Sequence, residues 1–243
     1  NCTGDTSIAL SMISDDSFYM EMKKDYAPEM VTAFIRLNGA TVGCVANRSE
    51  VYTDGEKTAA YDAALTAAGC EKAAAFVNFC NAFEIPVLTL VNVDGYKNCK
   101  CNEKKIAKAA ARLTYAFANA DVPKVTVVVG KANGTAGLTM NSKSIGSDIV
   151  YAWKNAKIGV MEAAPAVKIM YADEIAKADN AAALINEKAA QYNEMQASAL
   201  AAAKRGYVDD IIEASETRQR VVAAFEMLFT KREDRPSKKH GTI

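Results

Sequence analysis

From residue 56 onward, runs of β-branched apolar residues alternate with alanine-rich runs, and this alternation limits the folds open to the chain. Residues 86–93 (PVLTLVNV) and 124–130 (KVTVVVG) are apolar almost throughout, as buried parallel strands are. Residues 71–83 and 102–119 carry apolar side chains at helical spacing, and Pro86 and the Asp121-Val122-Pro123 segment end them. The order helix, strand, helix, strand predicts an α/β layered domain with crossover connections.

The first 60 residues have a different pattern. Residues 31–37 and 41–46 flank Asn38-Gly39, a dipeptide typical of a two-residue hairpin turn. Residues 1–30 are mixed and polar, with room for a short helix or strand. We therefore predict a leading segment over 1–30 and one domain over 31–243.

The C-terminal third predicts further short strands and helices. Asp209 and Asp210 are expected to cap or flank a helix, and the charged tail is expected to be loosely held. The predicted ranges are strands at 149–153 and 158–161, a long helical region at 172–204, a final helix with one apolar face at 216–230, and the tail at 231–243.

Composition excludes several classes of partner and site. The chain has 243 residues, with 29 basic side chains balancing 29 acidic ones, so it lacks the basic surplus of proteins that bind nucleic acid. No apolar run is long enough to span a membrane, and the start lacks a secretory signal, so a cytoplasmic location is expected. Cys99-Lys100-Cys101 is the only cysteine cluster and His240 the only histidine, so we expect no metal site.

The first candidate site is the glycine-rich segment 130–138 (GKANGTAGL), which follows a predicted strand. In layered α/β domains, ligands bind where strands end and helix N-termini present free N–H groups. We expect a turn here and then a helix over 138–144, with adjacent amides able to form an oxyanion hole. An ordinary left-handed turn between strand and helix is the alternative.

The second candidate is Asp94-Gly95 with Asn92, at the end of the preceding predicted strand. A solvent-exposed β-turn is the alternative interpretation. The sequence has no nucleophile elbow, phosphate-binding loop or dinucleotide fingerprint. A reaction that depends mainly on oriented N–H donors is therefore not excluded by the sequence.

Several segments resemble one enzyme family over almost the whole chain. The chain is similar to the C-terminal half of biotin-dependent acyl-CoA carboxyltransferases, the β subunits of propionyl- or acetyl-CoA carboxylases and the α subunits of glutaconyl- or methylmalonyl-CoA decarboxylases. The segments are 42–47 (VGCVAN), 72–80 (KAAAFVNFC), 122–126 (VPKVT), 147–153 (SDIVYAW), 205–213 (RGYVDDIIE) and 238–241 (KKHG).

The resemblance implies a crotonase-like (ClpP/crotonase) domain of repeated ββα units. It implies that this half receives carboxybiotin from a biotin carboxyl carrier protein, while an N-terminal half, on another chain or beyond this sequence, binds acyl-CoA. The site is then formed between subunits of a homo-oligomer. Biotin supplies the hard chemistry in such enzymes, and the protein supplies orientation and charge stabilisation.

Matched residue by residue, the family's biotin-side turn falls on 131–137. The resemblance implies that the amides of Thr135 and Ala136, shaped by Gly134, are the catalytic donors and contact biotin together with Asp94 and Gly95. The sequence departs from the family at Thr135, where the family has glycine, and a positive φ there would strain a β-branched residue. It also departs at Asn133, Gly137, Asn92, Asp94, Tyr96, Ala109 and Glu162.

Three hypotheses follow. The first is a carboxyltransferase or decarboxylase component, and the second is a non-catalytic structural subunit that keeps the fold and the oligomer contacts. Convergent free N–H groups beside a pocket favour the first, and internally bonded ones favour the second. A hydratase-like enzyme on the same fold would require acidic catalytic residues that we cannot place.

Overall fold

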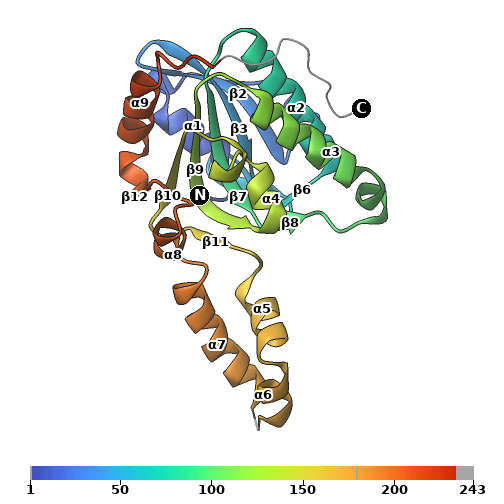
Figure 1. Cartoon of the computed structure of the whole chain (residues 1–243). Helices are drawn as coiled ribbons and strands as arrows, with labels where there is room; N and C mark the ends of the chain where they lie inside the picture. The colour runs from blue at the N-terminus through green and yellow to red at the C-terminus, as the bar shows by residue number, and fades with distance from the viewer. Residues whose placement is uncertain (1, 179, 234–243) are drawn as a thin grey trace.

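A twisted, mostly parallel sheet forms the centre of the molecule (Figure 1). The structure, a computed structural model, describes residues 2–178 and 180–233. The strand order is β1-β2-β3-β7-β9-β10-β12, and β11 pairs with the end of β9. These strands are β1 (Tyr19–Glu21), β2 (Met30–Leu37), β3 (Ala40–Asn47), β7 (Val87–Val93), β9 (Lys124–Asn133), β10 (Ile149–Trp153), β11 (Lys157–Gly159) and β12 (Asp210–Ile212).

The predicted hairpin is confirmed. Strands β2 and β3 pair antiparallel, and the turn between them places Asn38 at φ +50° and Gly39 at φ +79°. Positive φ at both central residues matches the right-handed twist of the flanking strands. From β3 onward the main sheet is parallel, so β7 is buried along its length and β9 is buried except at Gly130 and Lys131, as their apolar runs predicted.

Helices cover both faces of the sheet, which confirms the α/β layered class. On one face the core includes Leu10 of α1 (Thr6–Ile13) and Val221 of α9 (Thr217–Met227). On the other face the core includes Phe76 of α2 (Ala67–Ala82) and Leu113 of α3 (Lys100–Asn119). The remaining short strands lie outside the main sheet: β4 (Glu50–Thr53) pairs with β5 (Glu56–Ala60), and β6 (Ala64–Leu65) pairs with β8 (Gly95–Tyr96).

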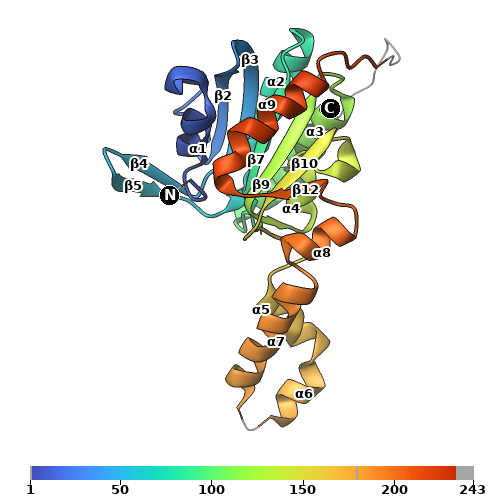
Figure 2. The same ribbon diagram turned by 90° about the vertical axis from the view of Figure 1, so that its left-hand side faces the viewer.

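The predicted helical region over 172–204 is confirmed, and it is divided into three helices. Asn180 accepts a hydrogen bond from the N–H of Ala183, and Ser198 accepts one from the N–H of Ala201, so each begins a new helix. The helices are α6 (Ala172–Lys177), α7 (Ala181–Met195) and α8 (Ala199–Lys204). Together with α5 (Ala163–Met170), α6 and α7 form an arm that projects from the body (Figure 2).

Asp209 and Asp210 do not flank a helix as predicted. Asp210 begins strand β12, and the Asp209 carboxylate accepts a hydrogen bond of 2.8 Å from the N–H of Val150 on β10. Lys143 forms an ion pair of 2.8 Å with the same carboxylate. Asp209 therefore fixes the last strand against its neighbour, a non-local role that the sequence alone does not reveal.

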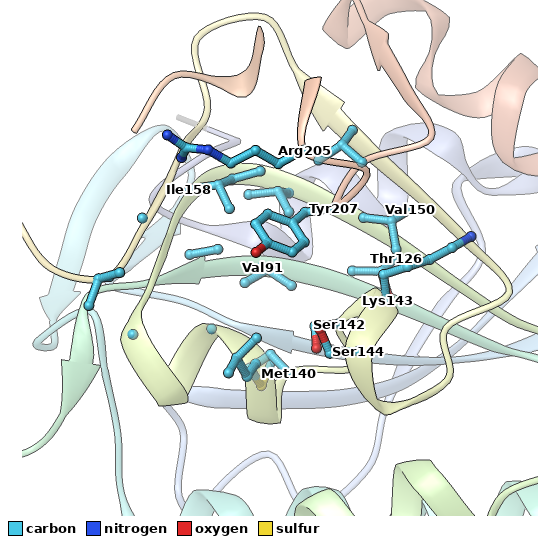
Figure 3. Close-up of a pocket in the computed structure, with 18 of the residues that line it drawn as sticks. Val91, Thr126, Met140, Ser142, Lys143, Ser144, Val150, Ile158, Arg205 and Tyr207 are labelled. Atoms are coloured by element: carbon cyan, nitrogen blue, oxygen red, sulfur yellow. The ribbon is translucent and has the colours of Figure 1, made fainter. Parts of the chain in front are cut away.

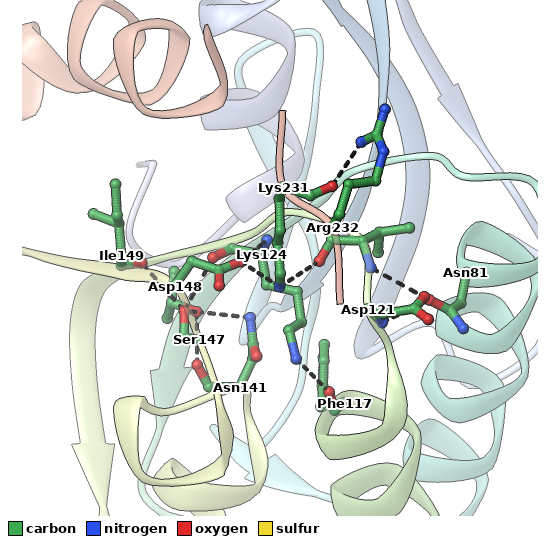
Figure 4. Close-up of polar contacts among 12 residues, drawn as sticks. Asn81, Phe117, Asp121, Lys124, Asn141, Ser147, Asp148, Ile149, Lys231 and Arg232 are labelled. Atoms are coloured by element: carbon green, nitrogen blue, oxygen red, sulfur yellow. Dashed lines mark hydrogen bonds and ion pairs between the residues drawn. The ribbon is translucent and has the colours of Figure 1, made fainter. Parts of the chain in front are cut away.

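A polar network holds the end of the described chain (Figure 4). Lys231 donates hydrogen bonds to Asp148 at 2.9 Å and to the carbonyl of Val122 at 3.2 Å, so this part of the predicted loose tail is fixed. Nearby, Lys124 is buried and donates to the carbonyl of Phe117 at 2.7 Å. His240 lies outside the described residues.

A buried ion pair joins the edge of the sheet to the loop before β4. Arg48 and Glu21 lie 3.0 Å apart, with side chains only 4% and 6% exposed. Tyr19 donates a hydrogen bond of 2.9 Å to Glu21, and burial raises the pKa of Tyr19. Lys72 is buried close by, where burial lowers its pKa, and it donates to the carbonyl of Ala27 at 3.3 Å.

The raised pKa values of two buried thiols predict that the protein loses stability at alkaline pH. Burial raises the pKa of Cys70 and of Cys80 to about 12, from the usual thiol value of 9.0. Between pH 9 and 12 the folded state therefore keeps thiol protons that the unfolded state loses. The contribution of each thiol to the free energy of unfolding is fully present below pH 9, and it falls by about 1.4 kcal/mol per pH unit between pH 9 and 12. In urea unfolding across this range, Cys80→Ala should show a shallower decline than the wild type. An unchanged slope would contradict this prediction.

Candidate functional site

The glycine-rich segment is the end of a strand followed at once by a helix, and not the predicted turn. Strand β9 continues through Gly130 to Asn133, because β11 pairs with residues 131–133. Gly130 serves packing, since a Cβ there would overlap the side chain of Asn92. Helix α4 (Gly134–Thr139) then begins four residues before the predicted start at 138.

The backbone at the start of α4 is unusual at Gly134 and not at Thr135. Gly134 has φ +59°, and a Cβ there would lie 3.0 Å from the carbonyl oxygen of Val160. Thr135 is absent from the residues with positive φ in the described chain, so the anticipated strain does not arise. Gly137 allows close packing, since its Cβ would lie 2.7 Å from the carbonyl carbon of Ala132.

The first turn of α4 carries the predicted donors. In any helix the first N–H groups have no carbonyl partner four residues back within the helix. Here these groups belong to Gly134, Thr135 and Ala136. The side chain of Thr135 is exposed and that of Ala136 is buried, so the turn lies at the boundary between core and surface.

The structure brings the second candidate segment against the first. Asp94, which follows β7, accepts a hydrogen bond of 3.0 Å from the side-chain amide of Asn133, the residue before Gly134. Lys131 donates to Asp94 and to Glu162, each at 2.8 Å. The backbone of Gly95 pairs with β6, so the segment is not a free exposed turn.

This network keeps Lys131 charged. Burial lowers the pKa of the Lys131 ammonium, but the hydrogen bonds from Lys131 to Asp94 and Glu162, together with their charges, outweigh burial and hold the pKa above its usual value. The resemblance had marked Glu162 only as a departure. Its pairing with Lys131 joins residues 31 positions apart, a contact for which the sequence carries no local signal.

A cavity of about 480 Å³ lies beside the start of α4 (Figure 3). Gly134 and Thr135 form part of its wall, and apolar side chains such as Val91 and Ile158 form much of the rest. Tyr207 and Arg205, from the loop after α8, approach from the opposite side to Met140. Its size is in the range of small-molecule sites, which are apolar with a few polar groups.

A polar group in this cavity was missed by the sequence analysis. The Oγ of Ser142 is buried and, among the described residues, has no hydrogen-bond partner. Figure 3 shows it beside Ser144 near Met140. Buried polar atoms in proteins are almost always satisfied, so this unpaired hydroxyl beside the cavity is unusual. The sequence analysis had placed Ser142 inside a helix over 138–144, whereas α4 ends at Thr139.

Comparison with known proteins decides the family. The sequence matches the carboxyl transferase domain over residues 1–243. The chain belongs to the carboxyl transferase domain family. This carboxyl transferase domain is 40% identical to the methylmalonyl-CoA carboxyltransferase 12S subunit of Propionibacterium freudenreichii subsp. shermanii, over 98% of this chain and 44% of that protein. It is also 40% identical to the methylmalonyl-CoA decarboxylase subunit alpha of Propionigenium modestum, over 96% of this chain and 44% of that protein.

Solved structures agree. The carboxyl transferase domain superposes on a transcarboxylase 12S crystal structure, determined with methylmalonyl-coenzyme A and methylmalonic acid bound, with a TM-score of 0.89 and 41% identity. The match covers 98% of this chain and 44% of that one. The crotonase-like fold is thus confirmed, and the chain spans less than half the length of these relatives. Among the described residues, no helix is both long and apolar enough to cross a membrane.

Proposed function

We propose that this chain supplies the biotin side of an acyl-CoA carboxyltransferase, which moves a carboxyl group between a biotin carboxyl carrier protein and an acyl-CoA. Family membership and the cavity beside Gly134 and Thr135 support this proposal. The acyl-CoA is expected to bind the N-terminal half found in the family. We keep the division into a leading segment, 1–30, and a carboxyltransferase domain, 31–243, as part of this proposal.

The described residues fit biotin chemically. An apolar cavity suits its thioether ring and aliphatic chain, and the unpaired Ser142 hydroxyl can meet a ureido or carboxyl oxygen. When bound, carboxylated biotin supplies the carboxyl group and an oxygen on which negative charge develops. The amides of Thr135 and Ala136 are proposed to donate to that oxygen, with Gly134, Asp94 and Gly95 shaping the surrounding backbone.

The chain's own residues orient the donors in this proposal. Asp94 accepts a hydrogen bond from the side chain of Asn133, the residue directly before α4. Lys131 donates a second hydrogen bond to Asp94 and so fixes its carboxylate. A fixed donor stabilises developing charge without reorganising during the reaction, and one such donor is worth about 3–4 kcal/mol. No acidic or basic side chain is needed at the reacting atoms.

The decisive experiment measures carboxyl exchange between free biotin and malonyl-, methylmalonyl- or glutaconyl-CoA, in the complex purified with its natural partners. Exchange with one of them supports the proposal and identifies the acyl group. Absence of exchange with all three, in a folded complex, would favour a structural subunit instead.

Replacement of Lys131 tests the orienting network. Lys131→Met should lower carboxyl exchange on the order of tenfold, because Asp94, which accepts the hydrogen bond from Asn133, loses the ion pair that fixes it. Stability should change by less than about 1 kcal/mol, because these ion pairs are partly exposed. Lys154→Met, which breaks an exposed pair with Glu213, is the matched control and should leave exchange unchanged. Equal activity of both variants would contradict the role of Lys131.

The arm supports an oligomer. Ile169, Met170 and Met195 expose most of their apolar surface on α5 and α7, and no residue of α6 or α7 is buried. One of the matched transcarboxylase structures is described as a hexamer assembly. We infer that the arm contacts a second copy of this chain, and sedimentation should give a mass above that of a monomer.

A further inference from the structure

We propose that Cys99 and Cys101 form a redox-active dithiol that exchanges with low-molecular-weight disulfides. Their sulfur atoms lie 2.9 Å apart at the start of α3. Both residues are reachable from solvent, since Cys101 is exposed and Cys99 half-buried. Cys44, Cys70 and Cys80 are buried, and Cys2 is half-buried.

The backbone on both sides of the pair is fixed. The buried Asn102 donates a hydrogen bond of 2.7 Å from its side-chain amide to the carbonyl of Lys97. The side-chain oxygen of Asn102 also accepts one of 2.7 Å from the N–H of Ala67, at the start of α2. The first turn of α3, which carries the thiols, is therefore tied to the start of α2, so the backbone positions of Cys99 and Cys101 are fixed relative to each other.

The two thiols differ in acidity. The hydrogen bond between the two thiols lowers the pKa of Cys99, and the backbone N–H of Asn102 adds to this effect. The same hydrogen bond to Cys99 raises the pKa of Cys101. The thiolate is the nucleophile in exchange, and Cys99 occupies the N-cap of α3, where the positive end of the helix stabilises negative charge, so Cys99 is the attacking residue and Cys101 the resolving one.

The spacing favours a sulfur–sulfur bond over a metal. Two thiolates on a tetrahedral zinc ion, each about 2.3 Å from it, lie about 3.8 Å apart. At 2.9 Å the pair is closer than such a chelate allows. No His, Cys, Asp or Glu completes a three-ligand cluster there within residues 2–178 and 180–233.

The reaction balances with a disulfide such as oxidised glutathione. The Cys99 thiolate attacks one glutathione sulfur, the glutathione S–S bond breaks, and one glutathione thiolate leaves and takes a proton. The Cys101 thiol then gives up its proton and attacks the Cys99 sulfur, and the second glutathione leaves as a thiol. The protein loses two hydrogens, and the disulfide becomes two thiols.

The test uses the purified, fully reduced protein in mixtures of oxidised and reduced glutathione, followed by acid quenching, alkylation and mass spectrometry. The wild-type peptide that contains residues 99–101 should lose two hydrogens. Cys101→Ser should instead accumulate one glutathionyl group on Cys99, because the resolving thiol is absent. Cys99→Ser should react more slowly, and Cys2→Ser should behave like the wild type.

The proposal is overturned by either of two results. One is a wild-type 99–101 peptide that stays fully reduced at every glutathione ratio. The other is a wild-type peptide that retains a glutathionyl group without losing two hydrogens. Circular dichroism of each variant checks that the fold is intact, so that a reaction of unfolded protein is not mistaken for exchange at the native pair.

Discussion

Gly134→Ala is expected to lower carboxyl exchange about a hundredfold, since a displacement of reacting groups by about 1 Å can have that effect. Gly134 has φ +59°, and the added Cβ would lie 3.0 Å from the carbonyl oxygen of Val160. Because this oxygen belongs to the backbone, relief must come from movement of the first turn of α4, which carries the amides of Thr135 and Ala136. The measurement is kcat for exchange in the complete complex.

Gly39→Ala is the matched control for backbone strain. Gly39 also has positive φ, at +79°, but a Cβ there meets no atom within 4 Å, and the residue lies in the β2–β3 hairpin turn. Both variants should lose about 1–2 kcal/mol of stability from the left-handed conformation. Only Gly134→Ala should lose exchange activity, and equal activities would argue against a catalytic role for this turn.

Glu21→Gln should be the most destabilising single substitution that we propose, at about 3–5 kcal/mol. Among the ion pairs of the described residues, Glu21 is the only carboxylate paired with the guanidinium of Arg48, and the substitution removes its charge. The side chains of Arg48 and Glu21 are only 4% and 6% exposed. Lys72 is buried nearby and also loses the favourable charge of Glu21. Urea unfolding monitored by circular dichroism provides the measurement.

An exposed ion pair gives the control for this substitution. Glu174 pairs with Lys188 at 3.8 Å and has a side chain that is 60% exposed. Glu174→Gln makes the same chemical change where solvent replaces the lost partner, so stability should change by less than about 1 kcal/mol. Similar losses in the two variants would show that burial of the Arg48 pair does not govern its contribution.

Local signals predicted much of this fold. The Asn38-Gly39 turn, strands β7 and β9 and helices α2 and α3 all follow from rules that act within a few residues, and all were found close to their predicted positions. The division of the helical region 172–204 into separate helices also has a local signal, since Asn180 and Ser198 are favoured N-cap residues.

The site was less predictable because its geometry depends on distant residues. Gly130 was interpreted as a turn glycine, although its reason is the side chain of Asn92 from the neighbouring strand. The pairing of Lys131 with both Asp94 and Glu162 brings three chain segments together. Sequence spacing predicts contacts along one element, but such contacts arise only when the sheet has assembled.

The arm is an excursion of the chain between two strands of the main sheet. The chain leaves the sheet after β11, passes through α5, α6 and α7, and returns through α8 to β12, while α6 and α7 bury no residue of their own. Insertions and deletions in this excursion therefore leave the register of β9, β10 and β12 intact. The inner end of the arm differs in this respect, because Tyr192 of α7 lines the cavity beside α4, so a partner bound to the arm would contact an element of the candidate site.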